Sequence, residues 1–436
     1  MNKLLQNLRR RGYWFVDYLT GSKTKNHFSE IKNILENPGG NKTMKIRKKR
    51  LEHLLSHAAS TTPFYAKFKG NKDLHNFPVI NKNIVLDNYD DFKSSDYKDA
   101  RLHKASSSGS TGIPFSIFQN KVKRSRNTAD VIYFSEIVDS LLGNRLIYLK
   151  LWDHTNVKKK STMFLQNILA HNVMDSSNEE IKKLLSQIAK DKSDKNILGY
   201  PSFFEEICNY LDVQQDLPRI SNVNSIISFA ESLKDLERDR MSKYFNAPIF
   251  ERYSNQENGI LAQQTKDSNG NFMLNWASYY FEILELESDD HVKSGGLGRI
   301  VVTDLFNFSM PMIRYDTGDM AIYGKDEAGY PFLSKIYGRR TDTIYNTSGE
   351  IVSPFIFYMV LDFSTIRQFQ FIQKDKTEYL FKLNGNPQDV EEEEIIKYFR
   401  NYLGDDANIK FEYVQEIPLL SSGKRKKIVN EFMEYV

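Results

Sequence analysis

The stretch Ser106-Ser107-Ser108-Gly109-Ser110-Thr111-Gly112-Ile113-Pro114 holds four serines, one threonine, two glycines and no charged residue. Glycine lets the backbone take positive φ values and approach a ligand closely. Backbone N–H groups and hydroxyls are the donors that an uncharged loop offers to phosphate oxygens. The following residues, 115–118, alternate like a short strand. The pattern therefore predicts a phosphate-binding loop, with a flexible Ser/Gly linker as the alternative; it lacks the Gly-Lys-Ser/Thr ending of a Walker loop.

Length and composition exclude several classes of protein. A chain of 436 residues is long enough for two or three domains. Its net charge of +4 gives no signature of polyanion binding, and the short basic tracts at 45–50 and 158–160 lack interleaved aromatic residues, so we expect no nucleic-acid partner. The single cysteine, Cys208, excludes a disulfide framework and a cysteine-rich zinc site, and fits a cytoplasmic protein.

The N-terminus combines charge with a short apolar segment. Three arginines, 9–11, are followed by the apolar residues 13–16. The apolar part is too short for a signal peptide or a membrane span. We expect a helix packed on the body of the protein, with at most a peripheral contact to a membrane surface.

Strands and helices alternate through the middle of the chain. Helical patterns cover 120–142, 179–190 and 231–244, and the second opens with Ser177 as a candidate cap. Apolar strand patterns lie at 146–149, 225–229 and 248–250. This alternation predicts an α/β fold with much parallel sheet. After residue 270 the predicted strands follow each other closely, which indicates an antiparallel or barrel-like β portion. Their ranges are 272–275, 280–286, 298–303 and 320–323.

A smaller unit begins near residue 338. Strand patterns at 368–373, 379–383 and 409–414 surround a helical pattern at 388–403, and a further helix is expected near 355–362. About 100 residues of mixed α+β pattern is a normal size for a domain. We therefore expect two domains, 1–337 and 338–436.

Several further motifs stand in fixed order behind the Ser/Gly loop. They are 228–232, 253–257, 298–319, 338–344 and 418–424. Together they resemble the adenylate-forming superfamily, and most of all its phenylacetate–coenzyme A ligase-like branch, which includes proteins of capsular polysaccharide pathways. The resemblance extends from Leu51 to Val429. It implies a large N-terminal domain that binds ATP and an acid, followed by a small mobile catalytic domain.

The resemblance also assigns a nucleotide site. The phosphate-binding residues would be Ser107, Ser108, Gly109, Ser110, Thr111 and Gly112. Ala230 and Glu231 would line the adenine, and Tyr253 would stack on it. Asp319 would accept both ribose hydroxyls, which suits a carboxylate because it can accept two charge-assisted hydrogen bonds.

Four further roles are implied by the same resemblance. Glu257 would bind the Mg²⁺ that accompanies ATP, in keeping with the preference of that ion for carboxylate and phosphate oxygens. Arg339 would contact the ribose or a phosphate, and Asp342 would be the hinge between the domains. Lys424 would be the mobile catalytic lysine. Residues 254–256 depart from the usual Gly-x-Ser/Thr of the superfamily, which leaves the acid pocket less defined than the metal position.

The implied reaction has two steps. A carboxylic acid would attack the α-phosphate of ATP to give an acyl-adenylate and pyrophosphate, and a thiol of coenzyme A, a carrier protein or an amine would then take the acyl group. A nucleotidyl transferase that moves AMP to an acceptor and a non-catalytic nucleotide-binding homologue are the alternatives. The acid is not readable from the sequence, although its pocket is expected around Trp152, Tyr200 and 275–276.

Overall fold

The computed structural model describes residues 2–107, 115–152, 157–216, 219–286, 288–339, 344–350, 352, 356, 366–418 and 426–432. By its internal contacts the chain divides into two compact units, 1–336 and 337–436. We call them the first and the second unit and describe each by itself. The functional roles expected for two domains divided after residue 337 stay predictions.

Three helices open the first unit, α1 (Asn2–Leu19), α2 (Lys23–Glu36) and α3 (Asn41–Thr61). The carboxylate of Asp17 fixes the corner between the first two, because it accepts hydrogen bonds from the backbone N–H groups of Thr24 (3.0 Å) and Lys25 (2.9 Å). Helix α3 ends where Pro63 follows, as expected from the conformational restriction on a residue before proline. The short elements after it are 3-10 turns Pro63–Phe68, Leu74–Asn76 and Ser95–Tyr97, and helix α4 (Lys82–Asp87).

An eleven-stranded sheet forms the centre of the first unit, in the order β10-β11-β12-β13-β9-β8-β7-β6-β5-β3-β4. Its parallel half is built from five strands. They are β3 (Arg145–Lys150), β4 (Ile168–Asn172), β5 (Lys195–Gly199), β6 (Val223–Phe229) and β7 (Ile249–Asn255). The predicted α/β fold with much parallel sheet is confirmed.

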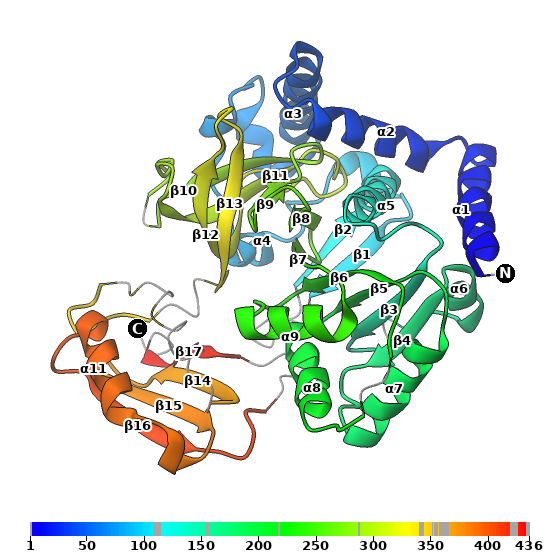
Figure 1. Cartoon of the computed structure of the whole chain (residues 1–436). Helices are drawn as coiled ribbons and strands as arrows, with labels where there is room; N and C mark the ends of the chain where they lie inside the picture. The colour runs from blue at the N-terminus through cyan, green and yellow to red at the C-terminus, as the bar shows by residue number, and fades with distance from the viewer. Residues whose placement is uncertain are drawn as a thin grey trace. The chain divides into compact units, whose positions relative to one another are not determined.

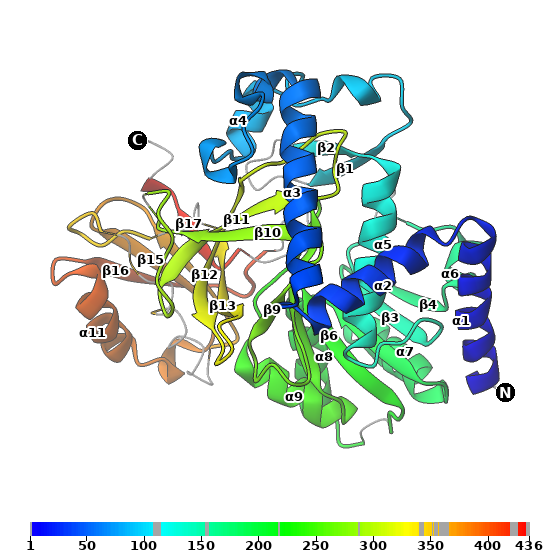
Figure 2. The same cartoon turned by 90° about the horizontal axis from the view of Figure 1, so that it is seen from above.

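Helices cover both faces of the parallel half (Figures 1 and 2). They are α5 (Lys121–Glu136), α6 (Lys160–Leu165), α7 (Asn178–Lys190), α8 (Pro201–Asp212) and α9 (Asp235–Phe245). Neighbouring residues of β6 belong to opposite faces: Ile226 packs in a core with α7, α8 and α9, and Ile227 in another with Val138. The predicted cap of α7 is confirmed, because Ser177 accepts from the N–H of Glu180.

The antiparallel half continues the same sheet. Its strands are β8 (Gly259–Gln264), β9 (Phe272–Leu274), β10 (Tyr279–Leu284), β11 (Leu297–Asp304), β12 (Tyr315–Lys325) and β13 (Pro331–Arg339). The antiparallel or barrel-like portion expected after residue 270 is present as antiparallel strands. Among the described strands the sheet runs open from β10 to β4 and does not close. Strands β8 and β13 were not foreseen as separate strands.

A separate hairpin carries the Ser/Gly loop. Strands β1 (His103–Ser107) and β2 (Phe115–Gln119) pair antiparallel, with Ser107 opposite Phe115. The expected strand after the loop is therefore present. Residues 108–114 lie outside the described part of the chain.

The second unit has a four-stranded sheet in the order β16-β15-β14-β17. Its elements are β14 (Gln368–Gln373), β15 (Glu378–Asn384), α11 (Glu392–Leu403), β16 (Asn408–Tyr413) and β17 (Ile428–Asn430). Phe371, Phe381 and Phe399 join the sheet to α11 through ring contacts of 4.5–5.6 Å. The expected α+β pattern is present, and the helix expected near 355–362 falls largely on residues that are not described.

Candidate nucleotide-binding site

The carboxyl ends of β6 and β7 bring two of the predicted site segments together. The strands pair in parallel with Phe229 opposite Arg252, so the next residues are neighbours: Ala230 directly follows the end of β6, and Tyr253 lies near the end of β7. Ala230 has φ 71°, in the left-handed region that a residue with a Cβ rarely adopts. Such backbone strain is common at ligand sites. Ligands of open α/β sheets bind outside the carboxyl ends of the strands, so this is a physically reasonable place for a nucleotide.

Tyr253 and Asp319 form the central pair of the site, although 66 residues separate them in the chain. The hydroxyl of Tyr253 donates to Oδ2 of Asp319 at 2.7 Å and lies 3.2 Å from Oγ1 of Thr317. Burial raises the pKa of Tyr253 well above its ordinary value, and the charge of Asp319 raises it further. The phenol therefore stays protonated at neutral pH and serves as a hydrogen-bond donor to the carboxylate.

A bulge in β12 directs the side chain of Asp319 toward Tyr253. Val301 of β11 stands opposite Asp316, and Arg299 opposite Met320, so the three residues 317–319 of β12 lie against the single residue Ile300 of β11. Gly318 takes φ +79° within the bulge, a value that glycine adopts without strain. The hydroxyl of Thr317 donates to the carbonyl of Ile300 at 3.0 Å. Bulges re-aim side chains next to active sites, and here the bulge carries a carboxylate out of the regular pleat.

Thr317 was not assigned a role by sequence reasoning. Its hydroxyl also accepts from the backbone N–H of Asp319 at 3.2 Å, so one side chain holds the bulge, the tyrosine and the aspartate together. The available signal was its place inside the motif 315–319, between two aspartates. The motif alone does not show which of its polar side chains points toward β7.

Glu231 has a structural partner that the sequence did not indicate. Its carboxylate accepts from the backbone N–H of Ser202 at 2.9 Å and lies 3.2 Å from the hydroxyl of the same serine. These groups belong to the first turn of α8, so Glu231 acts as a cap for a helix N-terminus, where a negative charge is favourable. The carboxylate expected to line the adenine is thus engaged by a neighbouring helix.

Glu257 lies in the tight turn between β7 and β8 and is largely buried, with 8% of its surface exposed. Its backbone carbonyl accepts from Nε2 of Gln119 at 2.9 Å, which ties the turn to β2. The next carbonyl, of Asn258, accepts from the hydroxyl of Tyr279 at 2.6 Å. The turn is therefore held rigidly from two sides, and it presents a carboxylate, the donor type that suits Mg²⁺.

Aromatic side chains gather beside Ala230 at the ends of β3, β5 and β6. The ring of Tyr148 lies 5.3 Å from that of Trp152 and 6.0 Å from that of Phe229, which in turn lies 5.0 Å from Tyr200. Trp152 and Tyr200, expected in the acid pocket, thus belong to one cluster.

Asn275 and Trp276 were expected in the same pocket, and the structure places them elsewhere. Asn275 is fully buried and donates to the carbonyl of Ile260 at 2.9 Å. Trp276 packs against a different hydrophobic core, with the guanidinium of Arg47 over its ring at 4.8 Å. Both residues directly follow β9, which belongs to the antiparallel half of the sheet. The sequence showed that a strand precedes them and did not show in which half of the sheet it lies.

Several predicted residues cannot be placed. Ser107 is the last residue of β1 and Arg339 the last of β13, but the orientations of their side chains are not described. The remaining predicted residues lie outside the described part of the chain: Ser108, Gly109, Ser110, Thr111, Gly112, Asp342 and Lys424. Their assignments stay predictions.

Comparison with known proteins gives consistent results. Residues 344–431 match the family described as the CapK C-terminal domain. The chain is 24% identical over 434 residues to Protein CapK of Staphylococcus aureus, covering 93% of each chain. Its fold is similar to that of 2-hydroxyisobutyryl-CoA ligase in complex with 2-HIB-AMP, with a TM-score of 0.70, 16% identity and 91% of each chain covered.

A benzoate CoA ligase from Burkholderia xenovorans LB400 is similar over 76% of this chain and 69% of its own, with a TM-score of 0.54 and 13% identity. At these identities the structural likeness establishes the fold. The resemblance to adenylate-forming ligases and to their capsule-associated branch is confirmed.

Proposed function

Given the fold of an adenylate-forming ligase, we propose that this protein activates a carboxylic acid with ATP and transfers the acyl group to an acceptor. The observation that carries the proposal is the hydrogen bond between Tyr253 and Asp319 beside the strained Ala230. An aromatic ring and a carboxylate held next to each other suit an adenine and a ribose. Solved structures of the same fold contain acyl-AMP, as in 2-hydroxyisobutyryl-CoA ligase.

In this proposal each residue of the first unit has one task. The carboxylate of Asp319 accepts the ribose hydroxyls, and the ring of Tyr253 stacks on the adenine. The loop 107–112 donates hydrogen bonds to the phosphates. Glu257 holds Mg²⁺, which when bound neutralises phosphate charge. Positioning and charge neutralisation provide most of the catalysis in reactions of this type.

The second unit supplies the remaining groups of the proposal. Lys424 neutralises charge that develops between the α-phosphate and the attacking carboxylate, and Arg339 contacts the ribose or a phosphate. The second unit then turns about Asp342 for acyl transfer, as conformational steps of this kind do between half-reactions. The acceptor is a thiol, of coenzyme A or of a carrier protein, or an amine. A role in polysaccharide biosynthesis is part of the proposal because the motifs resemble the branch that includes proteins of capsular polysaccharide pathways.

We place the acid beside the aromatic cluster of Tyr148, Trp152, Tyr200 and Phe229. This cluster adjoins Ala230, so a carboxylate reaching the α-phosphate would have its apolar part among the rings. Lys150 lies at the edge of the cluster, with its ammonium 4.2 Å from the Trp152 ring. A flat or branched apolar acid fits such a surface better than a charged sugar acid.

ATP–pyrophosphate exchange tests the proposal directly. The purified full chain is incubated with aryl, fatty, amino and sugar acids, each with and without Mg²⁺. Exchange that depends on one acid and on Mg²⁺ is expected. Exchange without any added acid, or AMP transfer to an acceptor without acyl product, would favour the nucleotidyl transferase instead, and ATP binding with no turnover on any acid would favour the non-catalytic homologue.

Substitution of Lys424 by alanine separates the two half-reactions. Formation of the adenylate should fall steeply, whereas a supplied acyl-adenylate should still be consumed by the acceptor. Lys426→Ala, two residues further along the same basic segment, is the matched control and should leave both rates within about threefold of the wild type, since this half-buried lysine has no role in the proposed site. Equal loss of both half-reactions in Lys424→Ala would contradict the assigned role.

We also propose that α1 binds a membrane surface. Its inner side is fixed to the body, where Nε2 of Gln6 donates to the carbonyl of Asp194 at 2.6 Å and Arg10 pairs with Glu136 at 3.1 Å. Its outer side exposes a continuous apolar stripe. The stripe consists of Leu4, Leu5, Leu8, Phe15, Val16 and Leu19.

The surroundings of this stripe favour an anionic lipid surface as its partner. Helix α6 lies beside α1 (Figure 2), and there Arg9 approaches the ring of Phe164 at 5.4 Å. Phe164 and Leu165 are each 70% exposed. Basic side chains flank the apolar ones, including Lys3 and Arg11, as in helices that lie in a membrane interface. No described helix is apolar over a length that could cross a bilayer.

Vesicle co-sedimentation tests this second proposal. The full chain should bind vesicles that contain phosphatidylglycerol and bind neutral vesicles at least several-fold more weakly. Leu8→Asp should abolish binding, and Val213→Asp, at an exposed position outside the stripe, should not. Dimerisation through α1 without vesicle binding would refute it.

A further inference from the structure

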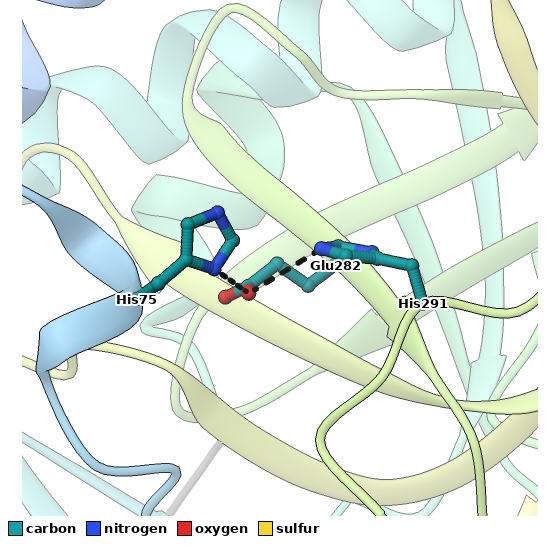
Figure 3. A group of neighbouring side chains, drawn as sticks. All are labelled: His75, Glu282 and His291. Carbon is teal, nitrogen blue, oxygen red and sulfur yellow. Dashed lines mark ion pairs between the residues drawn. The ribbon is translucent and has the colours of Figure 1, made fainter.

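Two histidines face one buried carboxylate in the first unit, away from the Tyr253–Asp319 pair. His75 lies in the turn Leu74–Asn76, Glu282 on β10, and His291 in the connection from β10 to β11. Nδ1 of His75 is 3.7 Å, and Nε2 of His291 3.9 Å, from Oε1 of Glu282 (Figure 3). All three ligand atoms lie within 4.8 Å of one another. We propose that this group, the His-Glu-His cluster, binds a divalent transition metal, with zinc as its first candidate.

The donor set has the chemistry of a zinc site. Two imidazoles and one carboxylate, with a fourth position open to water or another donor, are a ligand combination that zinc takes in proteins. Around a tetrahedral ion with bonds of roughly 2.0–2.1 Å, two ligand atoms lie about 3.3 Å apart. The two histidine–carboxylate separations are 3.7 and 3.9 Å, and all three ligand atoms lie within 4.8 Å of one another, so the ligands must draw closer around a bound ion. His75 and His291 have half-exposed side chains, so small rotations can close the difference without moving the backbone.

The carboxylate is the fixed member of the cluster. Glu282 is 1% exposed, and its Oε1 faces both histidines. Among the described residues this oxygen makes no hydrogen bond of good geometry, although Nη2 of Arg314 lies 3.1 Å away. Its other oxygen, Oε2, accepts from Nε of Arg314 at 3.1 Å. The ion pair with Arg314 leaves the buried Oε1 without a hydrogen bond of good geometry, so it can take a further partner. A metal ion between the two imidazoles would supply that partner.

The charge around the cluster allows a second cation. Nη2 of Arg314 lies 3.1 Å from Oε1, which by itself would disfavour a metal. However, the surrounding ion pairs contain three carboxylates and only two guanidiniums. They are Glu282, Asp289, Asp316, Arg299 and Arg314. With neutral imidazoles the group therefore carries a net charge of −1. A bound dication would change this to +1, so it would not be added to a site that is already positive.

A bound metal would join three separate segments. Arg314 already ties two of them, because it donates to the carbonyl of Phe77 at 3.0 Å while pairing with Glu282. The backbone N–H of Ile80 also donates to the carbonyl of Arg314 at 3.0 Å. The metal would add His291 and its loop to this junction. Asp319 follows Arg314 by five residues on the same chain segment. A metal bound to the His-Glu-His cluster would therefore stabilise the segment that leads into the bulge of β12.

Calorimetric titration of the metal-free full chain with Zn²⁺ tests the proposal. One zinc per chain is expected, and Mg²⁺ should not compete, since imidazole ligands suit zinc and not magnesium. His75→Ala and His291→Ala should each weaken zinc binding at least about tenfold. Loss of a residue that only hydrogen-bonds to a metal ligand already costs about that much affinity. His103→Ala, at another exposed histidine, is the matched control and should bind like the wild type. Buried Cys208 offers no competing exposed thiol.

Two further readouts separate a metal site from a histidine–carboxylate ion pair. Co²⁺ should give the intense visible absorption of a tetrahedral complex in the wild type and lose it in both variants. Zinc should raise the thermal unfolding temperature of the wild type and leave that of His75→Ala unchanged. Absence of a one-to-one site in the wild type, or zinc binding that survives both substitutions, would overturn the proposal. Neither measurement requires ATP, an acid or turnover.

Discussion

Replacement of Tyr253 by phenylalanine isolates the hydrogen bond at the centre of the candidate site. The ring that would stack on adenine is kept, and only the hydroxyl 2.7 Å from Oδ2 of Asp319 is removed. A hydrogen bond to a charged group contributes about 1.5–3 kcal/mol. Water can reach the partly exposed carboxylate and replace part of this hydrogen-bond energy. We therefore expect the free energy of Mg-ATP binding to weaken by about 1.4 kcal/mol, which is a tenfold higher Kd.

Calorimetry with Mg-ATP and the full chain measures the effect, and a double-mutant cycle assigns it. Asp319→Ala should weaken binding more than Tyr253→Phe. In the Asp319→Ala background the tyrosine hydroxyl no longer has its carboxylate, so adding Tyr253→Phe should cost little more, leaving a coupling free energy of about 1 kcal/mol. Tyr323→Phe, on the same strand as Asp319, is the control and should bind like the wild type.

Two results would refute this reasoning. Tyr253→Phe that binds Mg-ATP within twofold of the wild type would mean that the hydroxyl does not hold the carboxylate for the ribose. A tenfold loss that persists in the Asp319→Ala background would mean that the hydroxyl acts on something other than Asp319. Matching circular dichroism spectra and unfolding temperatures of all variants exclude a general loss of structure.

Three further predictions concern stability. Glu231→Ala should lower the unfolding temperature by about 2–4 °C, since it removes the carboxylate that caps α8 and costs about 1–2 kcal/mol. Burial lowers the pKa of His27 to about 4, below its unfolded value near 6.5. The folded protein therefore loses stability as the pH falls from 6.5 to 4, because the unfolded state takes up the proton first. His27→Gln should reduce this loss by about 1–2 kcal/mol, after allowing for solvent screening. Gly259→Ala should destabilise more than Gly270→Ala in thermal unfolding, because both have positive φ but only the first would place a Cβ 3.1 Å from Asn127; equal losses would contradict this.

Local sequence rules predicted much of the architecture. The cap at Ser177 and the strands around 146–149 and 225–229 were correct because capping and apolar runs depend on neighbouring residues. Strand β8 was missed although its residues are mostly buried, because it directly follows β7 through a three-residue turn and carries two glutamines. Periodicity does not separate two strands that share a short polar hairpin.

Long-range partners could not be predicted in the same way. Glu231 sits in a motif, yet its carboxylate is bound by the first turn of α8, 29 residues earlier. The helix α1 was expected to pack on the body, and it does so with polar Gln6 and Asp17 facing inward, whereas Leu4, Leu8 and Phe15 face solvent. An amphipathic pattern shows that one face is apolar, and it does not show which face the rest of the fold will cover.

The pair Tyr253–Asp319 depends on the curvature of the whole sheet. Strands β7 and β12 are separated by β8, β9 and β13, and four steps of about 4.8 Å would place them roughly 19 Å apart in a flat sheet. Their side-chain oxygens are nevertheless 2.7 Å apart. The sheet must therefore curl strongly between these strands, and the bulge at Gly318 must direct Asp319 across the curl. The closely spaced strands that suggested a barrel reflected this curvature, which stops short of closure among the described strands and leaves a concave end where Tyr253 and Asp319 meet.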